Sequence, residues 1–387
     1  MDEMAFDHMG KYFRLIIAMH RLVAAALFFG ALLVGLPHAW CQPVKIGLLT
    51  DKTGPFASAG EQISRGAHAA VADIPSSGPA AIDLVEWDSQ SQGSAAGSAA
   101  GRAAEKLIQL DGVRAVIVGP ESGTILAVDG MTARLKIPML SIGLLSRPLT
   151  NPFAVNLGDT LGHMMAYAIA YARNTNPAQM PRIDLMNEGI FGETLRKVAA
   201  DTQTAMMSPF HLSAPSIIFS FDKSGQAIAD QIQIPPSSVV IGGPILRGTA
   251  DGLIPKLPNN VKLVAFDLRD PVLEGIANLP TSLTAGQDAH RPFAYYGYAA
   301  VQIFRAALAK PGGVASVLRS DSYQTAVGAV RFLQSDGERF QPGLAVYVLS
   351  PGGILSFCPS CSTLTDNCQT GCKCQDGSCS QDCCTGH

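Results

Sequence analysis

A series of short apolar runs, separated by segments with helical periodicity, constrains the fold of this chain most. The first runs are VKIGLL (44–49), IDLVEWD (82–88), RAVIVG (114–119) and IPMLS (137–141). Strands that alternate with helices at this interval indicate βαβ units and a parallel sheet. Because the strands of such a sheet are buried on both faces, they are continuously apolar instead of alternating between apolar and polar residues.

A second series of the same kind begins near residue 153. Its expected strands are RIDLM (182–186), SIIFSF (216–221), SVVIGG (238–243), VKLVAF (261–266), VGAVRF (327–332) and LAVYVLS (344–350). Helices are expected at 163–173, from Phe191 to about Thr204, and at 294–310. Each series is large enough to form its own hydrophobic core. The sequence therefore predicts an α/β protein with two Rossmann-like lobes.

The N-terminal region predicts export. Residues 22–36 form an unbroken run of fifteen apolar or glycine residues behind the basic segment MHR, which is typical of a secretory signal peptide. A transmembrane anchor is the alternative, but it needs roughly 20 residues. We expect cleavage after Cys41; lipoprotein processing before Cys41 would require a small residue where Trp40 stands. Residues 1–41 are thus interpreted as a signal peptide with an N-terminal extension, and the mature protein as periplasmic.

Composition and motifs argue against several functions. A net charge of −3 with thinly spread charges lacks the basic stripe that nucleic-acid binding needs. VGPESGT (118–124) does not end in GK[ST], so it is not a phosphate loop. The histidines show no metal-ligand spacing, and no serine lies in GxSxG. We therefore expect no enzymatic activity, no cofactor and no nucleic-acid partner.

The same VGPESGT segment carries a candidate binding site. Ser122, Gly123 and Thr124 are predicted to open a helix after a strand. The free backbone N–H groups and the dipole at such a helix start favour a carboxylate or another anion. The alternative is structural, because Ser122 or Thr124 could simply cap the helix.

Four segments, in order along residues 44–354, carry a resemblance to a known family. They are KIGLLTDKTGPFASAGEQISRGAHAAVADI, VRAVIVGPESGTILAVDGMTARLKIPMLSIG, FAYYGYAAVQIFRAALA and TAVGAVRFLQSDGERFQPGLAVYVLSPGG. Together they resemble the leucine/isoleucine/valine-type periplasmic binding proteins of ABC importers. The resemblance implies a type I periplasmic binding protein fold, in which three hinge crossings join two lobes and the ligand is held between them.

The resemblance also implies site residues. On the first lobe, Ser122 and Thr124 would bind a ligand carboxylate, and the segment from Ser141 to Ser146 would face the same cleft. On the second lobe, Phe191 matches a family tyrosine, and Asp267 or Asp270 would hold the ligand's ammonium group.

The sequence departs from the family pattern at several of these positions. Phe191 lacks the tyrosine hydroxyl, and Leu144 and Leu145 replace smaller polar residues. Since a hydrogen-bonded site rejects analogues that lack the matching group, a carboxylate less polar than an ordinary amino acid fits better.

The resemblance implies a solute-binding protein that passes a small carboxylate- or amino-acid-like ligand to an ABC permease in the inner membrane, and we expect a monomer. The alternative is a periplasmic sensor that reports to a receptor or to a neighbouring oxidoreductase system. The expected domains are a first lobe at 42–156 and 286–326, a second lobe at 157–285 and 327–357, and a tail at 358–387.

The tail is cysteine-rich and is expected to be a separate module. Eight of the nine cysteines lie in it, and none lies between residues 42 and 357. In an exported chain, eight cysteines suggest up to four disulfides, with no pairing favoured. A thiolate metal cluster and a redox role are the alternatives. The candidate metal ligands are Cys358, Cys361, Cys372, Cys374, Cys383 and Cys384.

Overall fold

The computed structural model describes most of the chain between residues 43 and 357. The described ranges are 43–54, 56–73, 81–89, 96–175, 183–185, 189–201, 206–207, 216–221, 225–231, 233–249, 253–258, 260–283, 291–311, 314–340, 343–349 and 355–357. The predicted signal peptide and the cysteine-rich tail, including its candidate metal ligands, lie outside the described residues.

The first lobe is built on a five-stranded parallel sheet with the strand order β2-β1-β3-β4-β6. Helices cover both of its faces, because the strands are apolar on both sides. One face packs on α2 and α9, and the other packs on α3 and α4. The strands are β1 (Val44–Thr50), β2 (Ile82–Asp88), β3 (Ala115–Gly119), β4 (Met139–Ser141) and β6 (Ala154–Asn156). The helices are α2 (Ala57–Ala72), α3 (Ala96–Gln109), α4 (Ser122–Leu135), α9 (Arg291–Leu308) and α10 (Val314–Ser320).

The second lobe is built on a seven-stranded sheet with the order β16-β15-β12-β11-β10-β8-β9. Its last two strands in the chain, β15 and β16, are antiparallel to their neighbours. The strands are β8 (Ile183–Leu185), β9 (Met206–Met207), β10 (Ile217–Ser220), β11 (Val239–Gly242), β12 (Lys262–Leu268), β15 (Leu344–Leu349) and β16 (Leu355–Phe357). Its helices are α5 (Leu161–Thr175), α6 (Gly189–Asp201), α7 (Gly225–Gln231) and α8 (Pro244–Thr249).

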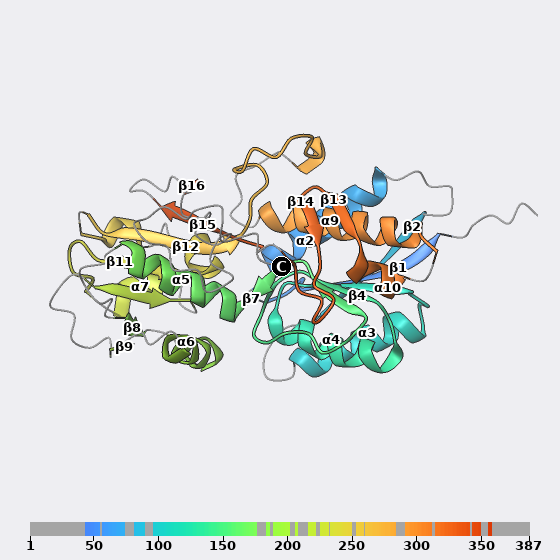
Figure 1. Ribbon diagram of the computed structural model, residues 1–387, viewed down its shortest axis with the longest axis horizontal. Coiled ribbons are helices and arrows are strands. Elements are labelled where there is room, and N and C mark those ends of the chain that lie inside the picture. Colours follow the sequence, from blue (N-terminus) through green and yellow to red (C-terminus); the bar gives the residue numbers. More distant parts are fainter. Residues whose placement is uncertain are drawn as a thin grey trace, which may run out of the picture.

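The chain passes between the two sheets three times. It leaves the first sheet after β6, returns after β12 to form α9, and leaves again after the hairpin of β13 (Ser322–Thr325) and β14 (Gly328–Arg331). A further short pair, β5 (Leu144–Leu145) and β7 (Asp159–Thr160), lies at the first crossing. Figure 1 shows the two sheets in separate halves of the molecule, with β7 between them. The expected two-lobe α/β fold is confirmed.

The lobe boundaries themselves stay a prediction, and the hydrophobic core suggests one change to them. Val327, Val330 and Phe332 are buried in the core of the first lobe, whereas the sequence-based boundary assigns them to the second. We therefore place the third crossing after Phe332. Within the described part of the chain, no helix is long and apolar enough to cross a membrane.

Candidate functional site

The predicted site residues lie near the carboxyl ends of strands in both sheets. In open α/β sheets, this is the edge at which ligands bind. Ser122 follows β3, Ser141 ends β4, and Asp267 lies near the end of β12. The contacts of each side chain show whether its hydrogen-bonding groups are available to a ligand or are already used within the protein.

Glu121, a residue that the sequence analysis missed, occupies the start of α4. It is the N-cap residue, and its carboxylate accepts hydrogen bonds from the backbone N–H groups of Gly123, at 2.8 Å, and of Thr124. These are two of the donors that we expected to be free for a ligand carboxylate. The alternative in which Ser122 or Thr124 caps the helix is also wrong, because Glu121 does so.

Ser122 and Ser146 form a hydroxyl pair beside this helix start. The Ser122 Oγ accepts from the Ser146 backbone N–H at 2.9 Å and lies 3.2 Å from the Ser146 Oγ. Both residues are half-buried, so their hydroxyls are more accessible than those of the buried Thr124 and Ser141. Thr124 is fully buried, and its hydroxyl has no hydrogen-bond partner among the described residues. The structure thus brings Ser122 and Ser146 together, and their role in ligand binding stays a prediction.

Ser141 is held inside the first lobe. Its hydroxyl donates to Asn156 Oδ1 at 3.0 Å, which ties the end of β4 to the end of β6. The residue is fully buried. A ligand contact at this hydroxyl would therefore require the two strand ends to separate.

The second-lobe acids are already paired with arginines. Arg247, in α8, lies 2.9 Å from Asp267 and 3.5 Å from Asp270. Arg291 lies 2.7 Å from the same oxygen of Asp270. Two cations therefore balance two carboxylates, and a ligand ammonium would have to displace an arginine.

The Arg247 guanidinium is buried and lies over the ring of Tyr347, 4.2 Å from its centroid. Burial is the largest single influence and lowers the pKa of Arg247, but the combined effect of Asp267, Tyr347 and Asp270 outweighs it, so the pKa is raised. Burial raises the pKa of the Tyr347 hydroxyl well above its ordinary value. The sequence analysis missed Arg247, although a charged residue five positions after a strand end was a usable signal. Phe191 lies in α6, and its side chain is outside the described residues.

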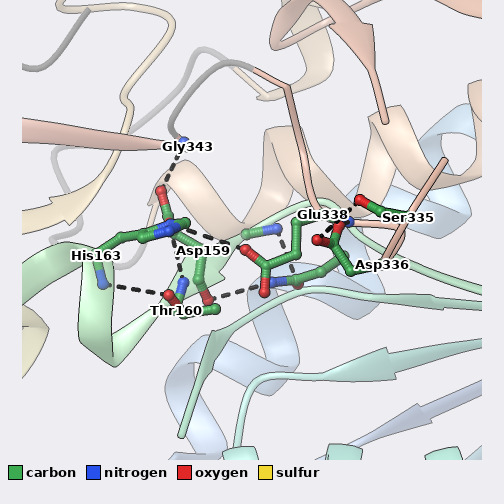
Figure 2. Close-up of polar contacts among 9 residues, drawn as sticks. Asp159, Thr160, His163, Ser335, Asp336, Glu338 and Gly343 are labelled. Atoms are coloured by element: carbon green, nitrogen blue, oxygen red, sulfur yellow. Dashed lines mark hydrogen bonds and ion pairs between the residues drawn. The ribbon is translucent and has the colours of Figure 1, made fainter. Parts of the chain in front are cut away.

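Three ionisable side chains meet at the first crossing between the lobes. His163 Nδ1 lies 2.9 Å from Asp159 Oδ1 and 3.8 Å from Glu338 Oε2. The hydrogen bond to Asp159 raises the pKa of His163, and burial raises the pKa of Glu338 to about 7. Figure 2 shows Glu338 reaching toward His163 and Asp159 from the segment before β15. The sequence pattern does not indicate this cluster, because Glu338 is far from the other two residues along the chain.

Comparisons with known proteins agree with this architecture. Residues 43–179 match the family model described as periplasmic binding protein. No curated protein sequence matches the chain. The family match covers most of the first lobe's strands and the start of the second lobe.

Several solved structures share the fold at low sequence identity. The branched-chain amino acid transporter substrate-binding protein LivJ from Streptococcus pneumoniae, in complex with isoleucine, has a TM-score of 0.59 at 15% identity, over 82% of this chain and 99% of that one. The leucine-binding protein LivK from Thermotoga maritima has a TM-score of 0.61 at 17% identity, over 81% and 97%. An ABC transporter solute-binding protein from R. palustris, in complex with benzoate, has a TM-score of 0.59 at 16% identity, over 81% and 95%.

The predicted resemblance is therefore confirmed: the chain resembles the leucine/isoleucine/valine-type periplasmic binding proteins. It has the type I periplasmic binding protein fold.

Proposed function

We propose that this protein is an extracytoplasmic solute-binding protein of an ABC importer. It captures a small ligand between its two lobes and delivers it to a permease in the inner membrane. The observation that carries the proposal is the architecture: two α/β sheets, joined by three crossings, with polar residues at the strand ends of both. Hinge closure around a ligand is the established way in which such a pair of lobes works. On this proposal the protein is not an enzyme, and it acts in the periplasm as a monomer.

The contacts at the strand ends support a ligand of low polarity. On the first lobe, Glu121 already uses the N–H groups of Gly123 and Thr124, so a ligand carboxylate would rely on the hydroxyls of Ser122 and Ser146. On the second lobe, the acidic side chains are neutralised by Arg247 and Arg291. We therefore propose a small carboxylate with a substantial apolar part, in preference to a free amino acid. Of the solved structures that share the fold, one is bound to isoleucine, a free amino acid, and another to benzoate, an apolar carboxylate.

A thermal-shift screen of carboxylates, amides and amino acids against the mature protein tests this proposal. A ligand present at 100 times its Kd stabilises the folded state by about 2.7 kcal/mol, which is readily seen as a higher Tm. We expect an apolar carboxylate to give the largest shift. Hits are then checked by calorimetry and by mass spectrometry of the ligand after incubation. Chemical turnover of the ligand, or a panel without any stabilising compound, would contradict the proposed function.

A further inference from the structure

The Asp159, His163 and Glu338 cluster has the composition of a metal site. One donor atom from each residue lies within 4.8 Å of the others. Donors that share one transition-metal ion at about 2.0–2.2 Å lie within about 4.4 Å of each other. Adjustments of less than an ångström would therefore bring the three donors around one ion. His163 can supply such an adjustment, since its side chain is half exposed.

Glu338 provides a second, independent observation, because one of its carboxylate oxygens is buried and unsatisfied among the described residues. Its side chain is only 9% exposed, yet its Oε1 has no hydrogen-bond partner among the described residues. A buried carboxylate oxygen without a partner is costly. Its other oxygen faces His163 (Figure 2). The unsatisfied Oε1 therefore belongs to the same carboxylate whose Oε2 lies 3.8 Å from His163 Nδ1.

Asp159 is held in the way that metal-binding carboxylates usually are. Its Oδ1 accepts a hydrogen bond from the Thr160 N–H at 2.7 Å, and its Oδ2 accepts from the Gly343 N–H at 3.1 Å. Such outer contacts orient a ligand side chain and leave further lone pairs for an ion. The neighbouring Asp336 adds a third carboxylate, which is held by the Glu338 N–H at 3.0 Å. The local charge is therefore negative, since His163 is the one basic group within the cluster.

We propose that Asp159, His163 and Glu338 bind one divalent first-row transition-metal ion, such as Mn²⁺ or Zn²⁺, at the hinge between the lobes. Two carboxylates and an imidazole suit these ions. The ion would link the first crossing, which carries Asp159 and His163, to the third, which carries Glu338. Bound metal should therefore stabilise the arrangement of the two crossings. The cluster shares no residue with the strand-end site at which we place the transported ligand, although Asp159 pairs with Leu144 in the short β5–β7 pair beside it.

Mn²⁺ binding to the full mature protein tests the proposal, because Mn²⁺ is hard and competes poorly for the thiols of the tail. Electron paramagnetic resonance of free Mn²⁺ counts the bound ions. Wild type is compared with His163→Ala and Glu338→Gln. His68→Ala is the matched control, because His68 pairs with one carboxylate, Glu86, at 3.2 Å, and no three-donor group forms around it in the part of the chain that the structure describes.

We expect one Mn²⁺ per chain in wild type and in His68→Ala, and at least about a tenfold loss of affinity in both cluster variants. Mn²⁺ should also raise the Tm of wild type but not that of His163→Ala. Circular dichroism confirms that each variant is folded. Equal Mn²⁺ affinity in wild type and in either cluster variant would overturn the proposal. Wild type that binds neither Mn²⁺ nor Zn²⁺ at this cluster would overturn it as well. The ligand screen does not depend on metal binding. The proposed metal site can therefore be wrong while the proposed solute-binding function is right, and the reverse also holds.

Discussion

At the start of α4, the side chains of Glu121, Ser122 and Ser146 make the hydrogen bonds. Glu121 takes the backbone donors of Gly123 and Thr124, while Ser122 and Ser146 bond to each other. A carboxylate from a ligand would meet the negative charge of Glu121 here, so only the serine hydroxyls offer it an attractive contact. Ser122 is therefore the first-lobe residue whose loss should weaken binding most.

The first prediction is that Ser122→Ala lowers ligand affinity about 10- to 150-fold. The reason is the loss of a hydrogen bond to a charged group, which is worth roughly 1.5–3 kcal/mol. Calorimetry with the best ligand from the screen measures the change. Ser320→Ala is the control, because the Ser320 hydroxyl donates within its own helix turn, to Val317 O at 3.4 Å, and lies far from the start of α4 along the chain. Unchanged affinity in Ser122→Ala would show that this residue was wrongly carried over from the family.

The second prediction concerns Arg247, whose side chain is 3% exposed and faces two buried carboxylates. Arg247→Met should lower the free energy of unfolding by about 3–5 kcal/mol, because it leaves Asp267 without its buried partner. Urea unfolding measures the loss. Lys256→Met is the control: it removes an exposed ion pair with Asp230, and exposed pairs contribute little. A loss no larger than that of the control would mean that the carboxylates become protonated or solvated at little cost.

At the level of elements, the contact between α2 and α9 holds the first lobe together. The backbones approach closely because two glycines face the opposite helix. A Cβ at Gly66 would lie 1.8 Å from Ala294 O, and one at Gly297 would lie 2.2 Å from Ile63 O. No side chain fits at either position without moving the helices apart.

The third prediction is therefore that Gly297→Ala lowers the free energy of unfolding by at least about 1–3 kcal/mol, because the added methyl group overpacks the contact between the two helices. Gly130→Ala in α4 is the matched control, since a Cβ at Gly130 meets no atom within 4 Å. Alanine is favoured over glycine inside a helix, so this control should be about 0.5–1 kcal/mol more stable than wild type. Thermal and urea unfolding of both variants give the comparison. Equal stability of the two variants would contradict the close helix approach.

The elements themselves were largely predictable, and their long-range partners were not. Runs such as 44–49 and 114–119 predicted β1 and β3 because strands buried on both faces are apolar throughout. The same pattern of apolar runs did not reveal that β15 is antiparallel to β12. A buried strand is apolar whether it runs parallel or antiparallel to its neighbour, so its composition does not indicate its direction. The pattern also could not show which core residues 327–332 join, since an apolar segment does not specify which sheet it covers; Val327, Val330 and Phe332 pack in the core of the first lobe. Glu121 was missed because glutamate is not among the preferred N-cap residues.

At the scale of the whole molecule, the three crossings between the lobes meet at Gly343. Its N–H donates to Asp159, in the first crossing. Its carbonyl accepts from the backbone N–H of Arg269, in the second crossing, and from the hydroxyl of Tyr296 in α9. A Cβ at Gly343 would lie 2.7 Å from Gly158 O. A rotation of one lobe against the other would therefore require changes in backbone torsion angles close to Gly343. The proposed metal site lies at the same place, since Asp159 accepts from the Gly343 N–H.

The last prediction is that deleting residues 358–387 leaves the folding and ligand binding of the lobes nearly unchanged. No cysteine lies between residues 42 and 357, so after signal cleavage no disulfide can join the tail to the lobes. The tail contains a single leucine and no other large aliphatic or aromatic residue, so it offers little apolar surface to bury against them. The deletion also begins after β16, an edge strand of the second sheet, and leaves its pairing with β15 in place. Thermal unfolding and calorimetry compare the shortened protein with the full mature chain, which is measured with and without reductant. A shortened protein that fails to fold, or that loses its ligand, would show that the tail packs against the lobes or the hinge.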